Sequence, residues 1–260
     1  MISIAGKDRA ACLLGAKKPD ISIYYNYAGS FISSNYYVDK SPTWLTDFNK
    51  GLNIESYRDS LWEKTLENHY YGKLSRKDNY YGEEDDYLNA VYSPVFPIGF
   101  DHDSDPKSSI MGRPWFEREI LNLSLNAIAG EGLGNDLDPD LLFIGFSAMD
   151  WIIHDYGPFS QEVMDACIKL DRYLGTFINR VDDIVGLDNV LFVLTADHGG
   201  LPLPEYVVEQ GGIGGRINDA HFKEALQWID EEFEERLGNK FYHREGANFF
   251  LDKKKMRTEN

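Results

Sequence analysis

The sequence predicts an α/β fold with a mostly parallel sheet, on three observations. The apolar runs Leu141–Ser147 and Asn189–Leu194 have the length and composition of strands that are buried on both faces. The segment between them carries apolar residues at helical spacing, so the three pieces form a βαβ unit with an expected right-handed connection. The chain has 260 residues, 43% of them hydrophobic, which is enough for a large core. We therefore expect a single domain over residues 1–260.

Both ends of the chain read as core elements. Met1–Ala5 is an apolar strand without a leader before it, and Gly6–Leu14 reads as a turn and the start of a helix. Ala247–Asp252 is also strand-like and is followed only by a charged tail. A chain that starts and stops on core strands is expected to be a piece of a larger protein. Its outermost strands, Met1–Ala5 and Ala247–Leu251, would then be unpaired edges that are prone to aggregation.

Residues 20–110 are rich in Tyr, Asp, Asn, Ser and Gly, and we expect them to form a cap or insertion over the core. The pieces predicted within this region are two short strands and two short helices, at Ile21–Tyr25, Phe31–Tyr37, Pro42–Asn49 and Tyr57–Lys64. A carboxylate run, Glu83–Asp86, lies in a loop of the same region. Such a run could bind calcium, but it is more simply a solvated charge cluster.

Three longer helices are predicted in the second half. Trp115–Ala129 has apolar residues at helical spacing and leads into the Leu141 strand. Ser160 is a natural N-cap for the crossover helix that follows, with Glu162 in its first turn. The helix His221–Leu237 turns a row of glutamates outward, which is most simply a solvated face.

Composition excludes several classes of protein. Asp and Glu outnumber Lys and Arg by 43 to 26, giving a formal charge of −17, so we expect no binding to nucleic acid. Cys12 and Cys167 are too few for a disulfide framework, and their spacing matches no zinc or redox motif. No stretch approaches the roughly 20 apolar residues of a membrane span, and the N-terminus lacks a secretion signal.

Both predicted strands of the βαβ unit end in a carboxylate and an imidazole. Asp150 and His154 follow the first strand, and Asp197 and His198 follow the second. In open α/β sheets ligands bind beyond the carboxyl ends of the strands, and Asp with His suits a borderline-soft ion such as zinc. The pattern therefore suggests a metal site, mononuclear or binuclear.

The order and spacing of several motifs closely resemble the alkaline phosphatase superfamily. These motifs are Lys7-Asp-Arg9, Phe146-Ser-Ala-Met-Asp-Trp-Ile-Ile-His-Asp-Tyr-Gly-Pro158, Leu170-Asp171, Thr195-Ala-Asp-His-Gly199, Pro202-Leu-Pro-Glu205 and Gly215-Arg-Ile217. The branch that looks most similar is the phosphate-insensitive bacterial alkaline phosphatases, which are related to nucleotide pyrophosphatase/phosphodiesterases. The resemblance covers almost the whole chain and implies a three-layer sandwich with a mostly parallel central sheet.

The resemblance also implies a mechanism. In such enzymes two zinc ions activate a Thr or Ser nucleophile, and it assigns Asp150 and His154 to one zinc and Asp197 and His198 to the other. It likens Lys7 and Arg9 to the pair that holds the non-bridging oxygens of a phosphate monoester. The chemistry agrees, because a doubly charged monoester gains from a point charge and a planar donor fork.

The departures from the family pattern indicate a partial, central segment. The pattern places a metal-binding Asp, the nucleophile and a phosphate-contacting Asn before the Lys-x-Arg motif, and a third His for the first zinc near its end. His243 lacks the following glycine and is not recruited. Each metal then keeps two protein ligands, whereas a tetrahedral catalytic site normally has three. The expected function is therefore zinc-dependent hydrolysis of small phosphate monoesters with a nucleophile outside this chain, and the isolated chain is expected to be inactive.

Two alternatives stay open, a phosphodiesterase or nucleotide pyrophosphatase, and a non-catalytic remnant with half metal sites. Simpler interpretations hold for other polar residues: Thr195 as a structural hydroxyl, Gly211–Arg216 as a flexible turn, and His69, His102 and His221 as ordinary histidines. Relatives are usually exported, so a periplasmic or extracellular location is expected from the resemblance. The oligomeric state does not follow from the sequence.

Overall fold

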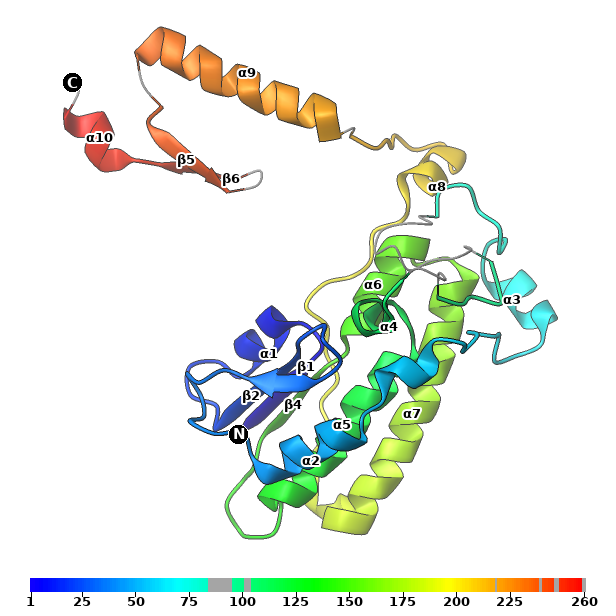
Figure 1. Cartoon of the computed structure of the whole chain (residues 1–260). Helices are drawn as coiled ribbons and strands as arrows, with labels where there is room; N and C mark the ends of the chain where they lie inside the picture. Colours follow the sequence, from blue (N-terminus) through cyan, green and yellow to red (C-terminus); the bar gives the residue numbers. More distant parts are fainter. Residues whose placement is uncertain (84–94, 101–103, 218, 239, 246–247, 259–260) are drawn as a thin grey trace. The chain divides into compact units, whose positions relative to one another are not determined.

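The computed structural model describes residues 1–83, 95–100, 104–217, 219–238, 240–245 and 248–258. Contacts divide the chain into two compact units, Met1–Val207 and Val208–Asn260 (Figure 1). Each unit has its own packing, and the expectation of one domain over residues 1–260 stays a prediction.

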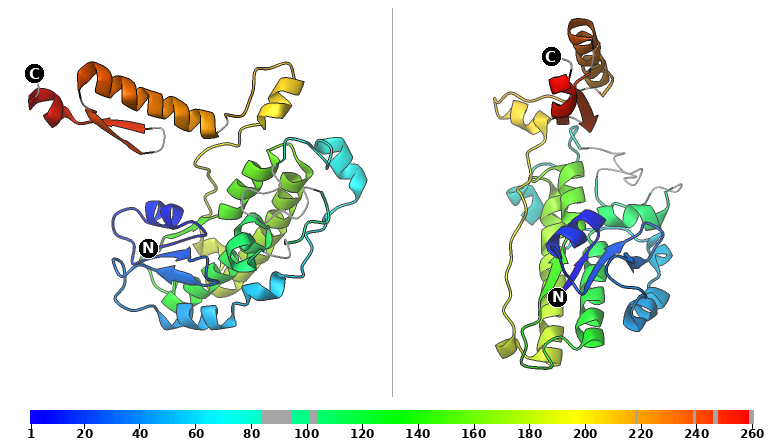
Figure 2. Two further views of the ribbon diagram at one scale, coloured as in Figure 1. Left: turned by 45° about the horizontal axis from the view of Figure 1, so that its top comes forward. Right: turned by 90° about the vertical axis from the view of Figure 1, so that its left-hand side faces the viewer.

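The first unit is built on a four-stranded sheet in the order β3-β2-β1-β4. Figure 2 gives two further views of the ribbon. Strand β1 (Ile2–Ala5) is parallel to both β2 (Ile21–Tyr25) and β4 (Leu142–Gly145), whereas β3 (Phe31–Ser33) is antiparallel to β2. The mostly parallel sheet predicted by the sequence is confirmed. Because β1 has a neighbour on each side, however, the expectation that it forms an unpaired edge is wrong.

Helices cover both faces of this sheet. Side chains alternate along each strand, so neighbouring residues point to opposite faces. Ile2 and Ile4 are fully buried in the same cluster as Phe116, so their face lies against α5 (Trp115–Glu131). Ser3 and Ala5 point to the opposite face, which is covered by α1 (Asp8–Leu14). Helix α7 (Gln161–Val185) packs on α5, beyond the sheet.

The remaining helices of this unit are short. In the described residues they are α2 (Thr43–Gly51), α3 (Asn68–Leu74), α4 (Pro106–Ser109) and α6 (Ser147–Tyr156), with 3₁₀ turns at Ile54–Tyr57, Ile110–Gly112 and Leu187–Asn189. Helix α8 (Pro204–Glu209) spans the boundary at Val207. The predicted helices at Gly6–Leu14, Pro42–Asn49 and Trp115–Ala129 are confirmed as α1, α2 and α5. The crossover helix is confirmed together with its cap, since the Ser160 hydroxyl accepts a 3.0 Å hydrogen bond from the Val163 N–H.

The second strand predicted for the βαβ unit is absent. Residues 190–194 form no strand and pair with no described strand, and Leu191 and Val193 are 88% and 80% exposed. The prediction of a buried strand at Asn189–Leu194 is therefore wrong for this structure. A buried strand needs neighbours on its edges and cover on both faces. This run pairs with no described strand, and its main cover is at Val190, which packs on the cluster that contains Phe177 and Val181.

Much of residues 20–110 belongs to the core rather than to a cap over it. Strands β2 and β3 are part of the main sheet, and Trp62 and Ile98 are fully buried in the same cluster as β1. The helix predicted at Tyr57–Lys64 is wrong, since Trp62 pairs with Ile98 in an isolated bridge.

The prediction that Glu83 belongs to a solvated charge cluster is also wrong. Its side chain is fully buried and forms an ion pair with Arg76 at 2.5 Å. Residues 84–86 of the predicted run lie outside the described residues.

The second unit contains a helix and a hairpin. Helix α9 (Asp219–Leu237) confirms the predicted helix, and β5 (Tyr242–Glu245) pairs antiparallel with β6 (Asn248–Leu251), followed by α10 (Lys253–Thr258). The ring of Tyr242 lies 5.1 Å from those of Phe233 and Phe249 and joins helix to hairpin. Strand β6 is thus paired on one side. Among the described residues, no helix is long and apolar enough to cross a membrane.

Candidate functional site

The candidate site lies beyond the carboxyl ends of β1 and β4. These strands are parallel neighbours with Ala5 opposite Gly145, so the chain leaves both strands at the same edge of the sheet. Lys7 follows β1, and α6 starts two residues after β4 and carries Asp150 and His154. This is where open α/β sheets bind ligands, and it is where the sequence analysis expects the Asp150 and His154 pair.

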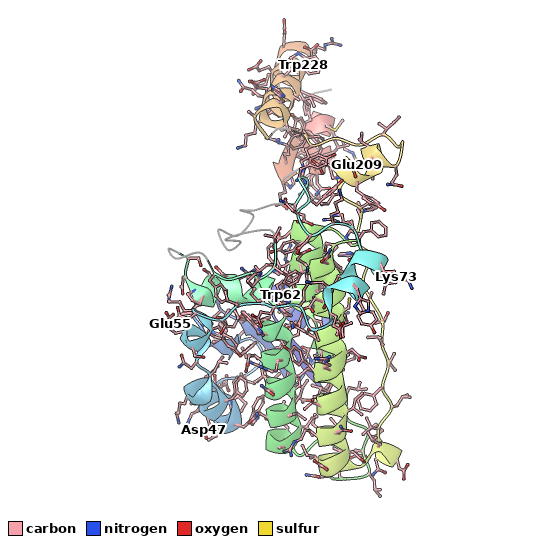
Figure 3. The ribbon with its side chains drawn as sticks, turned by 90° about the vertical axis from the view of Figure 1, so that its right-hand side faces the viewer. Asp47, Glu55, Trp62, Lys73, Glu209 and Trp228 are labelled. Atoms are coloured by element: carbon pink, nitrogen blue, oxygen red, sulfur yellow. The ribbon has the colours of Figure 1, made fainter. Side chains whose placement is uncertain are left out.

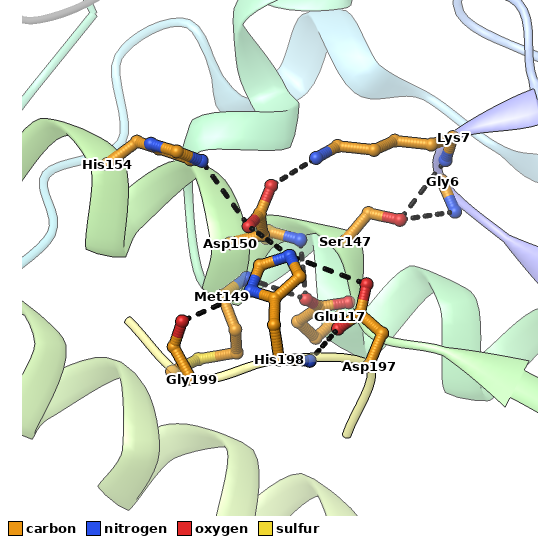
Figure 4. Close-up of polar contacts among 11 residues, drawn as sticks. Gly6, Lys7, Glu117, Ser147, Met149, Asp150, His154, Asp197, His198 and Gly199 are labelled. Atoms are coloured by element: carbon orange, nitrogen blue, oxygen red, sulfur yellow. Dashed lines mark hydrogen bonds and ion pairs between the residues drawn. The ribbon is translucent and has the colours of Figure 1, made fainter. Parts of the chain in front are cut away.

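Asp150 is at the centre of the site (Figure 4). Its carboxylate forms an ion pair with the Lys7 ammonium, and its Oδ1 lies 3.5 Å from His154 Nε2 and 3.9 Å from His198 Nε2. The four-residue spacing of Asp150 and His154 places both on one face of α6. The sequence motif therefore becomes a spatial cluster around one carboxylate.

The second predicted pair reaches the same place from a segment with no regular secondary structure. Oδ2 of Asp197 lies 3.5 Å from Nε2 of His198, and the His198 ring approaches Asp150. The side chains of Asp197 and His198 are 89% and 63% exposed, compared with 27% for Asp150. Asp150 is therefore partly buried and Asp197 is open to solvent, whereas the two imidazoles are similarly exposed, with His154 at 64%.

Gly200 permits the close approach of this segment to α6. A Cβ at this position would lie 2.5 Å from Cγ2 of Ile153, a distance that no real contact allows. Ile153 neighbours His154 on α6, so the absence of a side chain at Gly200 lets residues 197–200 lie against the helix that holds Asp150.

Lys7 and Arg9 have different surroundings. The ammonium of Lys7 lies 4.8 Å from the centre of the Trp151 ring in addition to its ion pair with Asp150. Arg9 lies in the first turn of α1 and is exposed, and its backbone N–H donates to Asp8 Oδ1 at 2.7 Å. The structure thus brings Lys7 into the cluster and leaves Arg9 at its margin.

Two further residues at the site were not singled out by the sequence. The Ser147 hydroxyl accepts hydrogen bonds from the backbone N–H groups of Gly6 and Lys7, both at 3.1 Å. Glu117, on α5, accepts through Oε1 from the N–H groups of Ala148 at 2.6 Å and Met149 at 3.1 Å. Burial raises the pKa of Glu117 to about 8, against a lowering effect of these two hydrogen bonds.

The donor types suit zinc, and they are arranged in pairs. Carboxylate oxygen and imidazole nitrogen are accepted ligands of this ion, and Asp150 with His154 and Asp197 with His198 supply one of each. No group of three or more His, Cys, Asp or Glu side chains in the described part of the chain is placed to hold a metal ion. A zinc ion held by either pair would need ligands beyond these two residues.

The other histidines that the structure describes lie outside this cluster. His69 stacks near Tyr70, His221 is exposed on α9, and His243 stacks on Phe250 in the hairpin of the second unit. His102 lies outside the described residues. Residues 211–216 are exposed and form no helix or strand.

Comparison with known proteins gives a consistent result. The sequence matches the family model of type I phosphodiesterases / nucleotide pyrophosphatases over residues 17–245. It is 32% identical over 219 residues to alkaline phosphatase PhoV of Synechococcus elongatus, which is 84% of this chain and 39% of the relative. It is also 32% identical over 203 residues to alkaline phosphatase PafA of Elizabethkingia meningoseptica, covering 76% of this chain and 36% of the relative.

The fold agrees with the sequence relationship. The structure superimposes on the crystal structure of wild-type alkaline phosphatase PafA with a TM-score of 0.83 and 25% identity, over 99% of this chain and 49% of the other. The chain thus spans less than half the length of these relatives. The family match over most of the sequence shows that the chain belongs to the type I phosphodiesterase / nucleotide pyrophosphatase family of the alkaline phosphatase superfamily.

Proposed function

We propose that this chain takes part in the zinc-dependent hydrolysis of phosphate monoesters. The observation that carries the proposal is the convergence of Lys7, Asp150, His154 and His198 at one edge of the sheet. A cation beside paired Asp and His donors is an arrangement that can hold a phosphate ester against a metal. The alkaline phosphatases to which the chain is similar support the same reaction class.

Each residue of the cluster has a role in this proposal. Asp150 with His154 would hold one zinc, and Asp197 with His198 would hold the other. Bound zinc would supply Lewis acidity and lower the pKa of an attacking hydroxyl group. Lys7 binds a non-bridging phosphate oxygen as a point charge, and Arg9 turns in to offer a planar fork to the same group. The attacking Thr or Ser is supplied from outside residues 1–260, so the isolated chain is expected to be inactive.

A phosphodiesterase or nucleotide pyrophosphatase is the second candidate, because these activities give the matching family model its description. Lys7 and Arg9 favour the monoester, since a diester carries one negative charge fewer and gains less from two cations. A remnant without activity is the third candidate, and it is favoured by the two-ligand pairs. We also propose a location in the periplasm or outside the cell, as the resemblance implies.

Zinc binding tests the metal assignment directly. By titration calorimetry, the chain is expected to bind zinc weakly, because two protein donors leave much of the coordination shell to water. Asp150→Ala should weaken this binding about tenfold or more, equivalent to about 1.4 kcal/mol. Asp183→Ala is the matched control, since Asp183 is an exposed aspartate on α7. Binding of two zinc ions that Asp150→Ala leaves unchanged would place the metal elsewhere.

Substrate charge separates the two enzymatic candidates. In the complete enzyme of this proposal, Lys7→Ala should reduce kcat/KM for an aryl phosphate monoester by about 100-fold, equivalent to about 2.7 kcal/mol. The loss for the corresponding diester should be much smaller, since less charge is neutralised. Lys73→Ala, which changes an exposed lysine on α3, should affect neither substrate. Equal losses for both substrates would count against the monoester.

A further inference from the structure

Helix α6 is fixed at its first turn by a carboxylate from another helix. Glu117 of α5 is 1% exposed, and its Oε1 accepts the N–H groups of Ala148 and Met149. These are among the N–H groups that a helix cannot satisfy internally. The more usual solution is a Ser, Thr, Asp or Asn side chain at the N-cap, but Phe146 occupies that position and makes no side-chain cap.

Burying this carboxylate is costly. Glu117 Oε2 has no hydrogen-bond partner among the described residues, and a buried acid without full hydrogen bonding destabilises a fold. A neutral Gln would offer an oxygen to the same two N–H groups at a lower cost. The acid nevertheless lies at the first turn of α6, which is the turn that carries Asp150.

A second contact ties the same helix end to the loop after β1. The Ser147 hydroxyl accepts both Gly6 N–H and Lys7 N–H at 3.1 Å. The backbone reaches the hydroxyl because Gly6 has no side chain, since a Cβ there would lie 2.5 Å from the Phe116 ring and 2.9 Å from Ser147 Cβ. The loop that carries Lys7 and the helix that carries Asp150 are thereby joined by two hydrogen bonds (Figure 4).

We infer that Glu117 and Ser147 are positioning residues that hold the phosphate-binding Lys7 and the metal-binding Asp150 in register. The inference rests on the proposed function, and it adds two residues that themselves touch neither metal nor phosphate. Glu117 fixes the start of α6 against α5, and therefore the direction in which Asp150 and His154 project. Ser147 fixes the distance between that helix and the Lys7 loop. Placement errors of about 1 Å at such sites can cost about 100-fold in rate.

The test compares four variants in the complete enzyme: Ser147→Ala, Glu117→Ala, Glu117→Gln and the control Ser124→Ala. Ser124 is a buried serine of α5 whose hydroxyl donates to Ile120 C=O at 2.8 Å, away from α6. Thermal unfolding, zinc affinity, kcat, KM and the exchange rates of the Gly6, Lys7, Ala148 and Met149 amides are measured for each.

Ser147→Ala is expected to lower kcat at least tenfold while its loss in Tm matches that of Ser124→Ala, and to speed exchange at Gly6 and Lys7. Glu117→Ala should weaken zinc binding and speed exchange at Ala148 and Met149. Glu117→Gln should restore both, since its amide oxygen can accept the same N–H groups. A structural cap alone would lower Tm without changing kcat, KM or zinc affinity in the folded enzyme.

The two proposals fail in different ways. If the unsubstituted enzyme binds zinc and turns over phosphate esters, but Ser147→Ala and Glu117→Ala behave as Ser124→Ala does, the positioning inference is overturned and the proposed function stands. If the unsubstituted enzyme neither binds zinc nor hydrolyses phosphate esters, the proposed function is overturned and the inference with it.

Discussion

At the residue scale, the first unit contains three buried glutamates with raised pKa values, at positions 83, 117 and 162. Burial is the main cause that raises the pKa of Glu162 to about 9, and repulsion from Glu83 adds to it. Burial also raises the pKa of Glu83 to about 8, although the ion pair with Arg76 acts in the opposite direction. The folded state is therefore more stable when these acids are protonated than when they are ionised.

Stability should accordingly fall as pH rises. The unfolded Glu162 ionises near its ordinary pKa of 4.5 and the folded one near 9, so unfolding releases a proton between these values. The stabilisation is complete below the lower pKa and is lost as pH rises toward the upper one. In urea denaturation from pH 5 to pH 9, Glu162→Gln should lose less stability than the unsubstituted chain.

The control for this measurement is Asp183→Asn, at an exposed position of the same helix α7, which should follow the unsubstituted chain at every pH. Curves for Glu162→Gln that run parallel to those of the unsubstituted chain would show that Glu162 is ionised when folded.

At the scale of elements, helix α7 connects several parts of the first unit. It packs against α5 and α6, and its Asp165 carboxylate holds the irregular segment at residues 62–71. Trp62 Nε1 donates to Asp165 at 2.5 Å, and the Tyr71 hydroxyl and the Thr65 N–H donate at 2.6 Å (Trp62 is labelled in Figure 3). Burial opposes ionisation, but the hydrogen bonds from Tyr71 and Trp62 keep the pKa of Asp165 below its usual value.

Removing this carboxylate should detach the segment from the helix. Asp165→Ala leaves three donors in or near the core without their acceptor, and each such loss costs about 1–3 kcal/mol. The free energy of unfolding should therefore drop by roughly 3 kcal/mol or more. Asp171→Ala, at an exposed position of α7, should cost less than about 0.5 kcal/mol. Chemical denaturation measures both, and a loss below about 1 kcal/mol for Asp165→Ala would contradict this role.

At the scale of the whole molecule, the apolar run Leu191–Leu194 pairs with none of the described strands. Leu191–Leu194 follows α7 and precedes the Asp197 and His198 pair, and its side chains are largely exposed. Contiguous exposed apolar residues favour association, and an extended segment with unpaired N–H and C=O groups is able to pair with another chain.

We expect this run to drive self-association of the chain. The double variant Leu191→Lys with Val193→Lys should reduce the mass measured by sedimentation at high concentration, with little change in Tm because both side chains are exposed. Leu13→Lys is a matched control, since Leu13 is 80% exposed on α1 but lies outside the run. Equal masses for the double variant and the unsubstituted chain would rule out this run as the contact.

Features encoded over short stretches were predicted well. The Ser160 cap, the apolar stripe of α7, the strands β1 and β4, and the Asp-x-x-x-His spacing each depend on residues within a few turns of one another. The approach of Lys7 to Asp150 depends on β1 and β4 being parallel neighbours that end at the same edge, and the sequence did not show that pairing. The family resemblance was confirmed by the family match over residues 17–245 and by the similarity to alkaline phosphatases.

Tertiary structure alone decided the features that depend on distant partners. Glu117 meets α6 across 31 residues, Ser147 meets Gly6 across 141, and Trp62 meets Asp165 across 103. No short-range sequence pattern predicts these contacts, because each depends on how the elements pack. The Asn189–Leu194 run has the composition of a buried strand, but composition cannot supply a neighbour. A strand forms only where another strand accepts its hydrogen bonds, and that condition is set by the assembled sheet.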